Sequence, residues 1–295
     1  MSHTGIEYAR GDDGKPGYGW NFYVGCRHQE EGLCPLKGKC WAESMWKRQV
    51  GAAVKKGIVL SDFHHPHLIP ERLLFPLSIK KPSRFLVNFM GDLFGDWVEP
   101  EAEIGQTIEY TNGKVGQGYR FYYDAPLKRV VFEVARICPQ HTFIFLTKNP
   151  QNYQKWGEFP DNCWLGASAT DAMSFYESVA WLSKGKAKIK FISFEPLLES
   201  INGGECEGKR LDMLHAVQWA IIGQQTPASP KTTPQISWIK EIVEAADKAD
   251  CAVFLKNNLG ELLDTDRTIY PMSHRYIRNA IGGGEWKLRQ EFPKV

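Results

Sequence analysis

The chain has 295 residues, of which 43% are hydrophobic and 24% are charged. This composition is ordinary for a globular protein and excludes a disordered, collagenous or coiled-coil chain, and the length favours a single α/β domain over 1–295. The 36 Lys and Arg residues against 34 Asp and Glu residues give a formal net charge of +2, so no overall positive field attracts nucleic acid. We find no apolar run long enough to span a bilayer and no signal-peptide core at the start, and we therefore expect a cytoplasmic protein with no membrane partner.

Short apolar runs alternate along the chain with stretches long enough for a helix, which is the pattern of parallel β-α-β units. Apolar residues at helical spacing predict helices over 127–137 and 239–246. Strands that are apolar throughout are buried on both faces, so we expect a parallel sheet with outer helices that curls into a full or partial (β/α) barrel. The predicted strands are 20–24, 85–90, 142–146, 163–167, 189–194, 219–222 and 252–255.

The segment 101–124 interrupts this rhythm with polar and aromatic residues. The runs 107–111 and 119–123 flank Asn112-Gly113, which predicts a small β-hairpin. Because the segment follows the second main strand, we interpret it as a lid or substrate-contact insertion, while a passive surface excursion fits equally well. Arg120 lies within its aromatic run, which suits either stacking on a nucleobase or the buried face of the hairpin.

The strongest chemical signal is a loop that presents Cys26, Cys34 and Cys40 within fifteen positions after the first strand. Three thiolates can hold three irons of a four-iron cluster and leave the fourth iron open, whereas structural zinc normally takes four protein ligands. His28 provides a fourth ligand for the alternative, a Cys3His zinc site. His64, His65 and His67 are a second source of that ligand. The remaining cysteines, Cys138, Cys163, Cys206 and Cys251, are scattered and are interpreted as ordinary thiols.

Polar residues end nearly every predicted strand. In a parallel barrel these positions meet on the face that carries the chemistry, and the cysteine loop belongs to the same face. A strand end or helix cap in solvent is the alternative for each residue taken alone. The residues are Asp92, Lys148, Ser168, Glu195, Gln224 and Lys256.

Several blocks resemble a phage and prokaryotic family of radical S-adenosylmethionine (radical SAM)-like proteins of unknown function, distantly similar to spore photoproduct lyase. The N-terminal blocks are Trp20-Asn21, Gly25-Cys26, Cys34 and Cys40-Trp41-Ala42-Glu43. The later blocks follow in the family's order at 82–97, 138–148, 164–168, 194–198 and 291–293. Radical SAM enzymes typically place three and then two residues between their cysteines, whereas this loop has seven and then five.

The resemblance implies a 4Fe-4S cluster on the three loop cysteines and S-adenosylmethionine as its co-substrate. Gly91 and Asp92 would hold the ammonium of that molecule, and Trp41 would cover the adenine or the cluster. Ser168 would reach a ribose hydroxyl, and Glu195 would reach the ribose or the sulfonium. Reductive cleavage would then give a 5′-deoxyadenosyl radical that abstracts hydrogen from the substrate.

Lys148 and Lys256 have no assigned role in binding S-adenosylmethionine, so we expect them to contact the substrate. Two cations indicate that the substrate carries an anionic group such as a phosphate or a carboxylate. The substrate is either a small molecule or nucleic acid, and an electron donor such as flavodoxin or ferredoxin is the expected partner. The alternatives are a non-enzymatic, zinc-stapled module that binds nucleic acid or protein, and a redox or sulfur-transfer protein that never cleaves S-adenosylmethionine.

Overall fold

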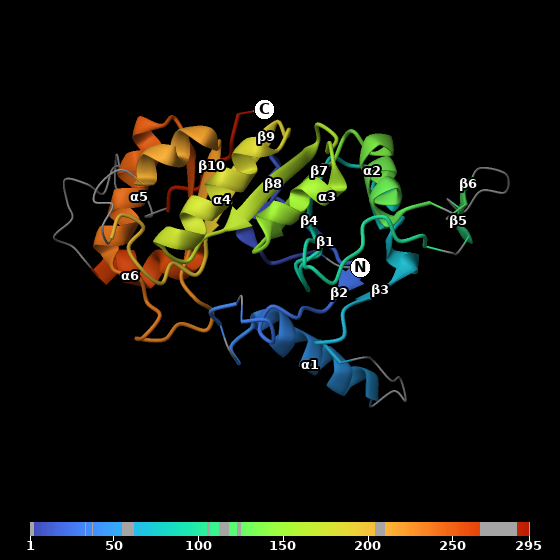
Figure 1. Ribbon diagram of the computed structural model, residues 1–295, viewed down its shortest axis with the longest axis horizontal. Helices are drawn as coiled ribbons and strands as arrows, with labels where there is room; N and C mark the ends of the chain where they lie inside the picture. The colour runs from blue at the N-terminus through green and yellow to red at the C-terminus, as the bar shows by residue number, and fades with distance from the viewer. Residues whose placement is uncertain are drawn as a thin grey trace. The chain divides into compact units, whose positions relative to one another are not determined.

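The computed structural model describes residues 3–32, 34–36, 38–54, 62–104, 107–111, 118–122, 125–203, 210–265 and 288–294. The chain divides into two compact units, Met1–Trp164 and Leu165–Val295. Seven parallel strands, flanked by helices, form one sheet in the order β1-β4-β7-β8-β9-β10-β11 (Figure 1). The unit boundary falls within β8 (Cys163–Ser168).

In the first unit, β1 (Tyr18–Trp20), β4 (Arg84–Val87) and β7 (Thr142–Thr147) pair in parallel. Aromatic side chains of the three strands stack across them: the ring centroids of Trp20 and Phe143 lie 5.3 Å apart, and those of Phe85 and Phe143 lie 5.4 Å apart. Each of these rings is fully buried, so cross-strand aromatic packing is a main source of this unit's stability.

Two asparagines fix the ends of β1 and β4. Asn21 Oδ1 accepts from the backbone N–H of Met90 at 3.0 Å, and Asn88 Oδ1 accepts from that of Tyr23 at 3.0 Å. Asn88 has φ of 55°, a left-handed conformation that asparagine tolerates better than most residues. The chain therefore turns sharply after β4 instead of continuing as a strand to residue 90.

Smaller elements surround these strands. An antiparallel pair joins β2 (Tyr23–Val24) to β3 (His67–Leu68), and α1 (Trp41–Val54) lies between them in the sequence. The amphipathic helix α2 (Leu127–Ile137) buries Val130, Val131 and Val134. The others are α3 (Tyr153–Trp156) and the 3₁₀ turns η1 (Glu7–Ala9), η2 (Pro70–Arg72), η3 (Phe75–Ser78) and η4 (Pro150–Asn152).

In the second unit, β9 (Ile189–Phe194), β10 (Trp219–Ile222) and β11 (Ala252–Leu255) pair in parallel. The C-terminal segment lies along β11 through a bridge between Phe254 and Gln290, and Trp219 Nε1 donates to the Glu291 carbonyl at 2.8 Å. The remaining elements are α4 (Ala172–Lys184), η5 (Arg210–Ala216), α5 (Ile236–Lys248), η6 (Asn257–Leu259) and α6 (Gly260–Thr265).

The predicted α/β class and parallel sheet are confirmed, as are the helices at 127–137 and 239–246. The predicted strand 20–24 is wrong in part, because Asn21 ends β1 and Tyr23–Val24 pairs with β3 in a separate sheet. No pairing joins β1 to β11 among the described residues, and the full or partial barrel stays a prediction. The single-domain boundary over 1–295 stays a prediction.

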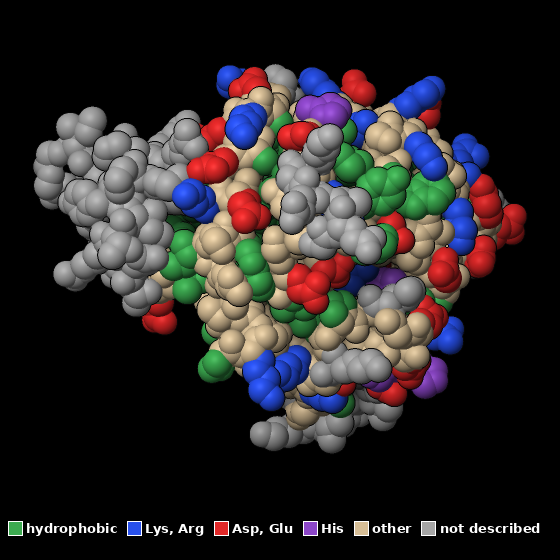
Figure 2. Space-filling view, turned by 60° about the vertical axis from the view of Figure 1, so that its left-hand side comes forward, with side chains coloured by type: hydrophobic (Ala, Val, Ile, Leu, Met, Phe, Trp, Pro, Cys, Tyr) green, Lys and Arg blue, Asp and Glu red, His purple; other side chains and the backbone are tan. Residues whose placement is uncertain are grey.

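The insertion contains the predicted hairpin strands, β5 (Thr107–Thr111) and β6 (Gly118–Tyr122), in antiparallel pairing. The predicted turn at Asn112-Gly113 lies outside the described residues, as does the side chain of Arg120. Among the described helices, none combines the length and apolarity that crossing a membrane requires. On the face in Figure 2, basic and acidic side chains are interspersed, in keeping with the small net charge.

Candidate functional site

The cysteine loop begins where two glycine backbones meet. Gly25 forms a parallel bridge with Gly91, and its N–H donates to the Met90 carbonyl at 3.0 Å. A Cβ on Gly91 would lie 2.3 Å from the Gly25 oxygen, and one on Gly25 would lie 2.6 Å from the Phe63 oxygen. Gly25 also has φ of 101°, which favours glycine. The loop can therefore start against the end of β4 only with glycine at both positions.

Burial governs the chemistry of the three loop cysteines. Cys34 is buried, and Cys26 and Cys40 are half-buried against the apolar cluster that contains Val24 and Met90. Burial raises the pKa of the Cys26 thiol to about 12 and also raises the pKa of Cys40. Without a metal, these two thiols stay protonated at neutral pH.

Backbone N–H groups and one lysine lower the pKa values of these thiols and so oppose the effect of burial. The N–H of His28 beside the Cys26 thiol lowers the pKa of that thiol, and the N–H groups of Ala42 and Glu43 at the start of α1 lower the pKa of Cys40. The Lys148 ammonium lowers the pKa of both thiols through its charge. These groups only partly offset burial and, at Cys26, the charge of Asp92, so the protein alone favours the neutral thiols.

Asp92 lies at the centre of a buried hydrogen-bond network. Its carboxylate accepts from His28 Nε2 at 2.8 Å, from Thr147 Oγ1 at 2.8 and 2.9 Å, and from the backbone N–H groups of Phe94 and Lys148 at 2.9 and 3.0 Å. Burial acts to raise the pKa of Asp92, but His28 and these N–H donors together hold it below its ordinary value. The carboxylate therefore joins the cysteine loop to the ends of β4 and β7.

His28 presents a buried nitrogen on the other side of its ring. Its side chain is 2% exposed, and its Nδ1 has no hydrogen-bond partner among the described residues. Metal-binding histidines commonly donate one ring N–H to a carboxylate and ligate through the other nitrogen. The pairing of Nε2 with Asp92 leaves Nδ1 available for that role.

The other predicted zinc-ligand histidines are placed differently. His64 Nδ1 lies 3.2 Å from the Cys26 carbonyl, and its Nε2 lies 3.6 Å from a Glu43 carboxylate oxygen. His65 is exposed, and His67 Nδ1 lies 3.1 Å from the His65 carbonyl. His64 therefore contributes to fastening the loop to α1, and His28 is the better-placed histidine for a metal.

In the second unit, two predicted residues pair with each other. Glu195 follows β9, Lys256 follows β11, and the Lys256 ammonium donates to the Glu195 carboxylate in a mostly buried ion pair. A Cβ on Gly223, which follows β10 between them, would lie 3.0 Å from Lys256 Cδ and 3.4 Å from Glu195 Cδ. Glycine at this strand end leaves space for the two side chains to meet.

The remaining predicted residues have local partners. Ser168 is buried at the end of β8, where its carbonyl accepts from Ser178 Oγ. Gln224 is tied to Asn258, whose Nδ2 donates to the Gln224 carbonyl at 2.7 Å. Trp41 opens α1 directly after Cys40, and 42% of its side chain is exposed.

The structure thus gathers Cys26, Cys40, Asp92 and Lys148 in the first unit, and Glu195 with Lys256 in the second. Among the described residues, no three His, Cys, Asp or Glu side chains form a group that could hold a metal ion, so the metal centre stays a prediction. Cys206 lies outside the described residues. The ligand roles of Gly91, Asp92, Ser168 and Glu195 also stay predictions.

The sequence interpretation missed the support of the loop by Thr147 and by the Asp92–His28 pair. The side chain of Thr147 contributes a hydroxyl to both Asp92 oxygens, and it belongs to the quoted Leu146-Thr147-Lys148 block. A polar residue ending an otherwise apolar strand was the available signal. Nothing in the spacing of His28 and Asp92, 64 positions apart, indicates that they touch.

Comparison with protein-family models matches residues 123–286 to a family described as a protein of unknown function, DUF5131. The match covers more than half of the 295 residues, and the chain belongs to this family. It includes Lys148, Ser168, Glu195 and Lys256, whereas the cysteine loop and Asp92 precede it. No curated protein and no solved structure matches the chain.

Proposed function

We propose that the protein is a radical SAM-type enzyme in which Cys26, Cys34 and Cys40 hold a 4Fe-4S cluster. The observation that carries the proposal is a single loop that presents three free cysteines, with its start fixed by the Gly25–Gly91 bridge and with Lys148 close to Cys26 and Cys40. Hydrogen bonds to the sulfurs and nearby charge are the means by which proteins stabilise and tune cysteine-bound clusters. When bound, the cluster would supply the electron that cleaves S-adenosylmethionine.

The chemistry of the donors suits such a group, although the three thiols would have to move together to bind it. Three thiols of one loop leave one iron of a four-iron cluster without a protein ligand, which is the position that S-adenosylmethionine would occupy. The glycine pair Gly25 and Gly91 fixes the start of the loop, and Asp92 holds its first turn through His28. Because protein donors already occupy both Asp92 oxygens, we propose that Asp92 positions the loop in addition to facing the ammonium of the ligand.

The finer fold and the substrate belong to the same proposal. We propose that the sheet is the partial (β/α) barrel of radical SAM enzymes, with the hairpin 101–124 as a substrate contact and Trp41 covering the adenine or the cluster. Glu195 offsets the charge of Lys256, so Lys148 is the stronger candidate for holding an anionic substrate group. A flavodoxin or ferredoxin would supply the electrons.

Anaerobic purification and reconstitution with iron and sulfide test the cluster. We expect a brown protein with about four irons per chain and visible absorbance that bleaches with dithionite, and we expect 5′-deoxyadenosine when S-adenosylmethionine is added. Cys34→Ala should lose the absorbance, and Cys138→Ala, which removes a buried thiol outside the loop, should keep it. Full iron retention in Cys34→Ala would remove Cys34 as a ligand. Colour without 5′-deoxyadenosine would instead support the redox or sulfur-transfer alternative.

One observation favours a second candidate, a closed Cys3His zinc centre in a non-enzymatic binding module for nucleic acid or protein. The buried Nδ1 of His28 has no partner among the described residues, and its ring is oriented by Asp92 as in many metal-binding histidines. Four protein ligands would saturate a tetrahedral zinc ion and leave no open position.

The two candidates differ in their response to His28→Ala. Loss of stoichiometric zinc from a colourless, anaerobically prepared protein would support the closed centre. If the loop holds a three-cysteine cluster, His28→Ala should retain about four irons per chain, although the protein will be less stable because Asp92 loses a partner.

A further inference from the structure

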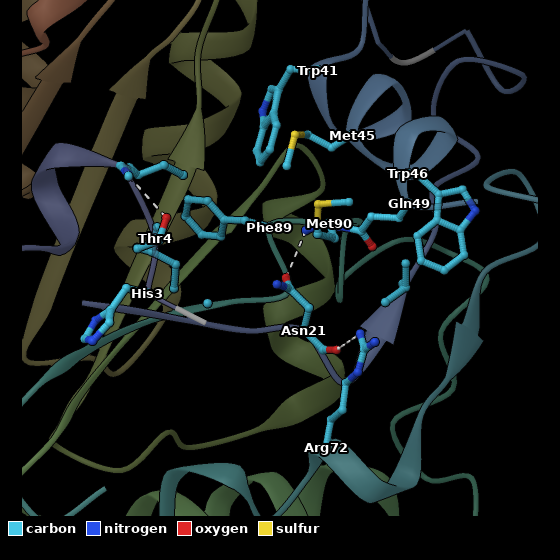
Figure 3. A pocket seen from close by; sticks show the side chains of 15 residues that line it. His3, Thr4, Asn21, Trp41, Met45, Trp46, Gln49, Arg72, Phe89 and Met90 are labelled. Atoms are coloured by element: carbon cyan, nitrogen blue, oxygen red, sulfur yellow. Dashed lines mark hydrogen bonds between the residues drawn. The ribbon is translucent and has the colours of Figure 1, made fainter. Parts of the chain in front are cut away.

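A cavity of about 390 Å³ lies in the first unit, apart from the thiols of the cysteine loop. The helix α1, the segment around Thr4 and the ends of β1 and β4 line it, and it is open to the surface on one side. Figure 3 shows Trp41 and Met45 reaching into it from α1, and Arg72 approaching from the opposite side. Its volume is in the range of small-molecule sites.

One wall of the cavity suits a flat apolar ring. Trp41, Phe89, Met45 and Met90 all line it. The Trp41 side chain is 42% exposed although it is large and apolar, so its indole is accessible to a ligand. Indole and phenyl faces with neighbouring thioethers make favourable contacts with planar aromatic groups.

The opposite wall carries a positive charge held in place by the fold. The Trp20 indole donates to the Arg72 carbonyl at 2.9 Å, and Arg72 Nη1 donates to the Asn21 carbonyl at 3.0 Å. That single contact leaves most of the guanidinium donors unused, and no carboxylate of the described residues forms an ion pair with them. Burial lowers the pKa of Arg72, with a smaller opposing effect from neighbouring Glu71, so the guanidinium is partly removed from water.

We propose that this cavity binds a small planar aromatic compound that carries a phosphate or carboxylate group. The ring would stack on Trp41 and Phe89, and the anionic group would take the unused donors of Arg72, which match such oxygens in a bidentate fashion. The loop thiols, Asp92 and Lys148 do not line the cavity, whereas Trp41, which the proposed function places over the adenine or the cluster, does. The inference therefore shares Trp41 with the proposed function and does not require a bound cluster.

Calorimetry on the full-length protein tests the site with four probes: adenosine 5′-monophosphate, indole-3-acetate, adenosine and inorganic phosphate. We expect at least one of the two aromatic anions to bind. Adenosine and phosphate alone should each bind at least about tenfold more weakly, because adenosine lacks the anionic group and phosphate lacks the ring. If neither aromatic anion binds at millimolar concentration, the proposal is overturned.

Two variants localise the binding. Arg72→Met should weaken the aromatic anion at least about tenfold, and Arg129→Met on the exposed surface of α2 is its matched control. Arg72→Met also loses the bond to Asn21, so a second variant, Gln49→Glu, is needed. Gln49 is exposed and lines the cavity, so the substitution should not unfold the protein. Its negative charge should lower the affinity for the aromatic anion about threefold or more. Unchanged affinity in both variants would refute the site. Iron content and 5′-deoxyadenosine formation, measured in parallel, report on the proposed function separately.

Discussion

Asp92 offers the sharpest test of how the first unit is held together. Its buried carboxylate accepts hydrogen bonds from His28, from Thr147 and from the backbone N–H groups of Phe94 and Lys148. Removing one member of a buried charged network costs about 3–5 kcal/mol, since the remaining buried groups lose their partner. We therefore expect Asp92→Ala to lower the free energy of unfolding of the first unit by about 3–5 kcal/mol.

Asp92→Asn refines this expectation. The amide oxygen can keep the donors of one carboxylate oxygen, but the amide nitrogen then faces the donors of the other, so we expect a loss of about 2 kcal/mol. Urea unfolding followed by tryptophan fluorescence measures both variants, with Asp161→Asn on the exposed surface as the control. A loss below about 1 kcal/mol in Asp92→Ala would refute the assigned network role.

The same carboxylate predicts a pH dependence. Since its folded-state pKa lies below the ordinary value of 3.8, Asp92 contributes stability above that pH, and the contribution is lost as the pH falls through the lower, folded-state pKa. Urea midpoints of the native protein should therefore fall more steeply with pH below about 4 than those of Asp92→Asn. Parallel curves for the two proteins would contradict this assignment.

Three further predictions concern other positions. Gly91→Ala forces a Cβ to 2.3 Å from the Gly25 oxygen and should cost about 2 kcal/mol or more in urea unfolding, whereas Gly51→Ala, in open space on α1, should stabilise by about 0.5–1 kcal/mol. Lys256→Met should cost about 3 kcal/mol by leaving Glu195 unpaired, and a double variant with Glu195→Gln should recover at least half of that loss. Burial raises the pKa of Cys251 to about 12, so iodoacetamide at pH 8 should label it only after unfolding, as mass spectrometry would show.

The sequence predicted the sheet well because its strands are buried on both faces. Apolar runs such as 189–194 and 219–222 have the same bounds in the structure as in the prediction. The error at 20–24 has a local cause: Asn21 uses its side chain to bond Met90, which ends the strand although the surrounding residues are apolar. Apolar periodicity reports burial and does not report such side-chain bonds.

The candidate site was less accessible to sequence reasoning. Strand-end positions identified Asp92, Lys148, Glu195 and Lys256, because polar residues after apolar strands stand out in the sequence. The sequence did not indicate which residues these side chains would contact. The pairing of Glu195 with Lys256 depends on the strand order β9-β10-β11, and the contact between His28 and Asp92 depends on the path of an irregular loop.

The charges of the two units differ in a way that bears on the chemistry. In the second unit the Glu195 carboxylate and the Lys256 ammonium offset each other. In the first unit, protein donors surround the Asp92 carboxylate, while Lys148 acts on Cys26 and Cys40, whose thiols are neutral at pH 7 without a metal. Thiolates at the three loop positions would repel one another and lose hydration, so they would require a compensating positive centre. Lys148 supplies one charge, and a metal centre would supply the remainder. The cysteine loop, rather than the ion pair of the second unit, is therefore where we expect a cofactor.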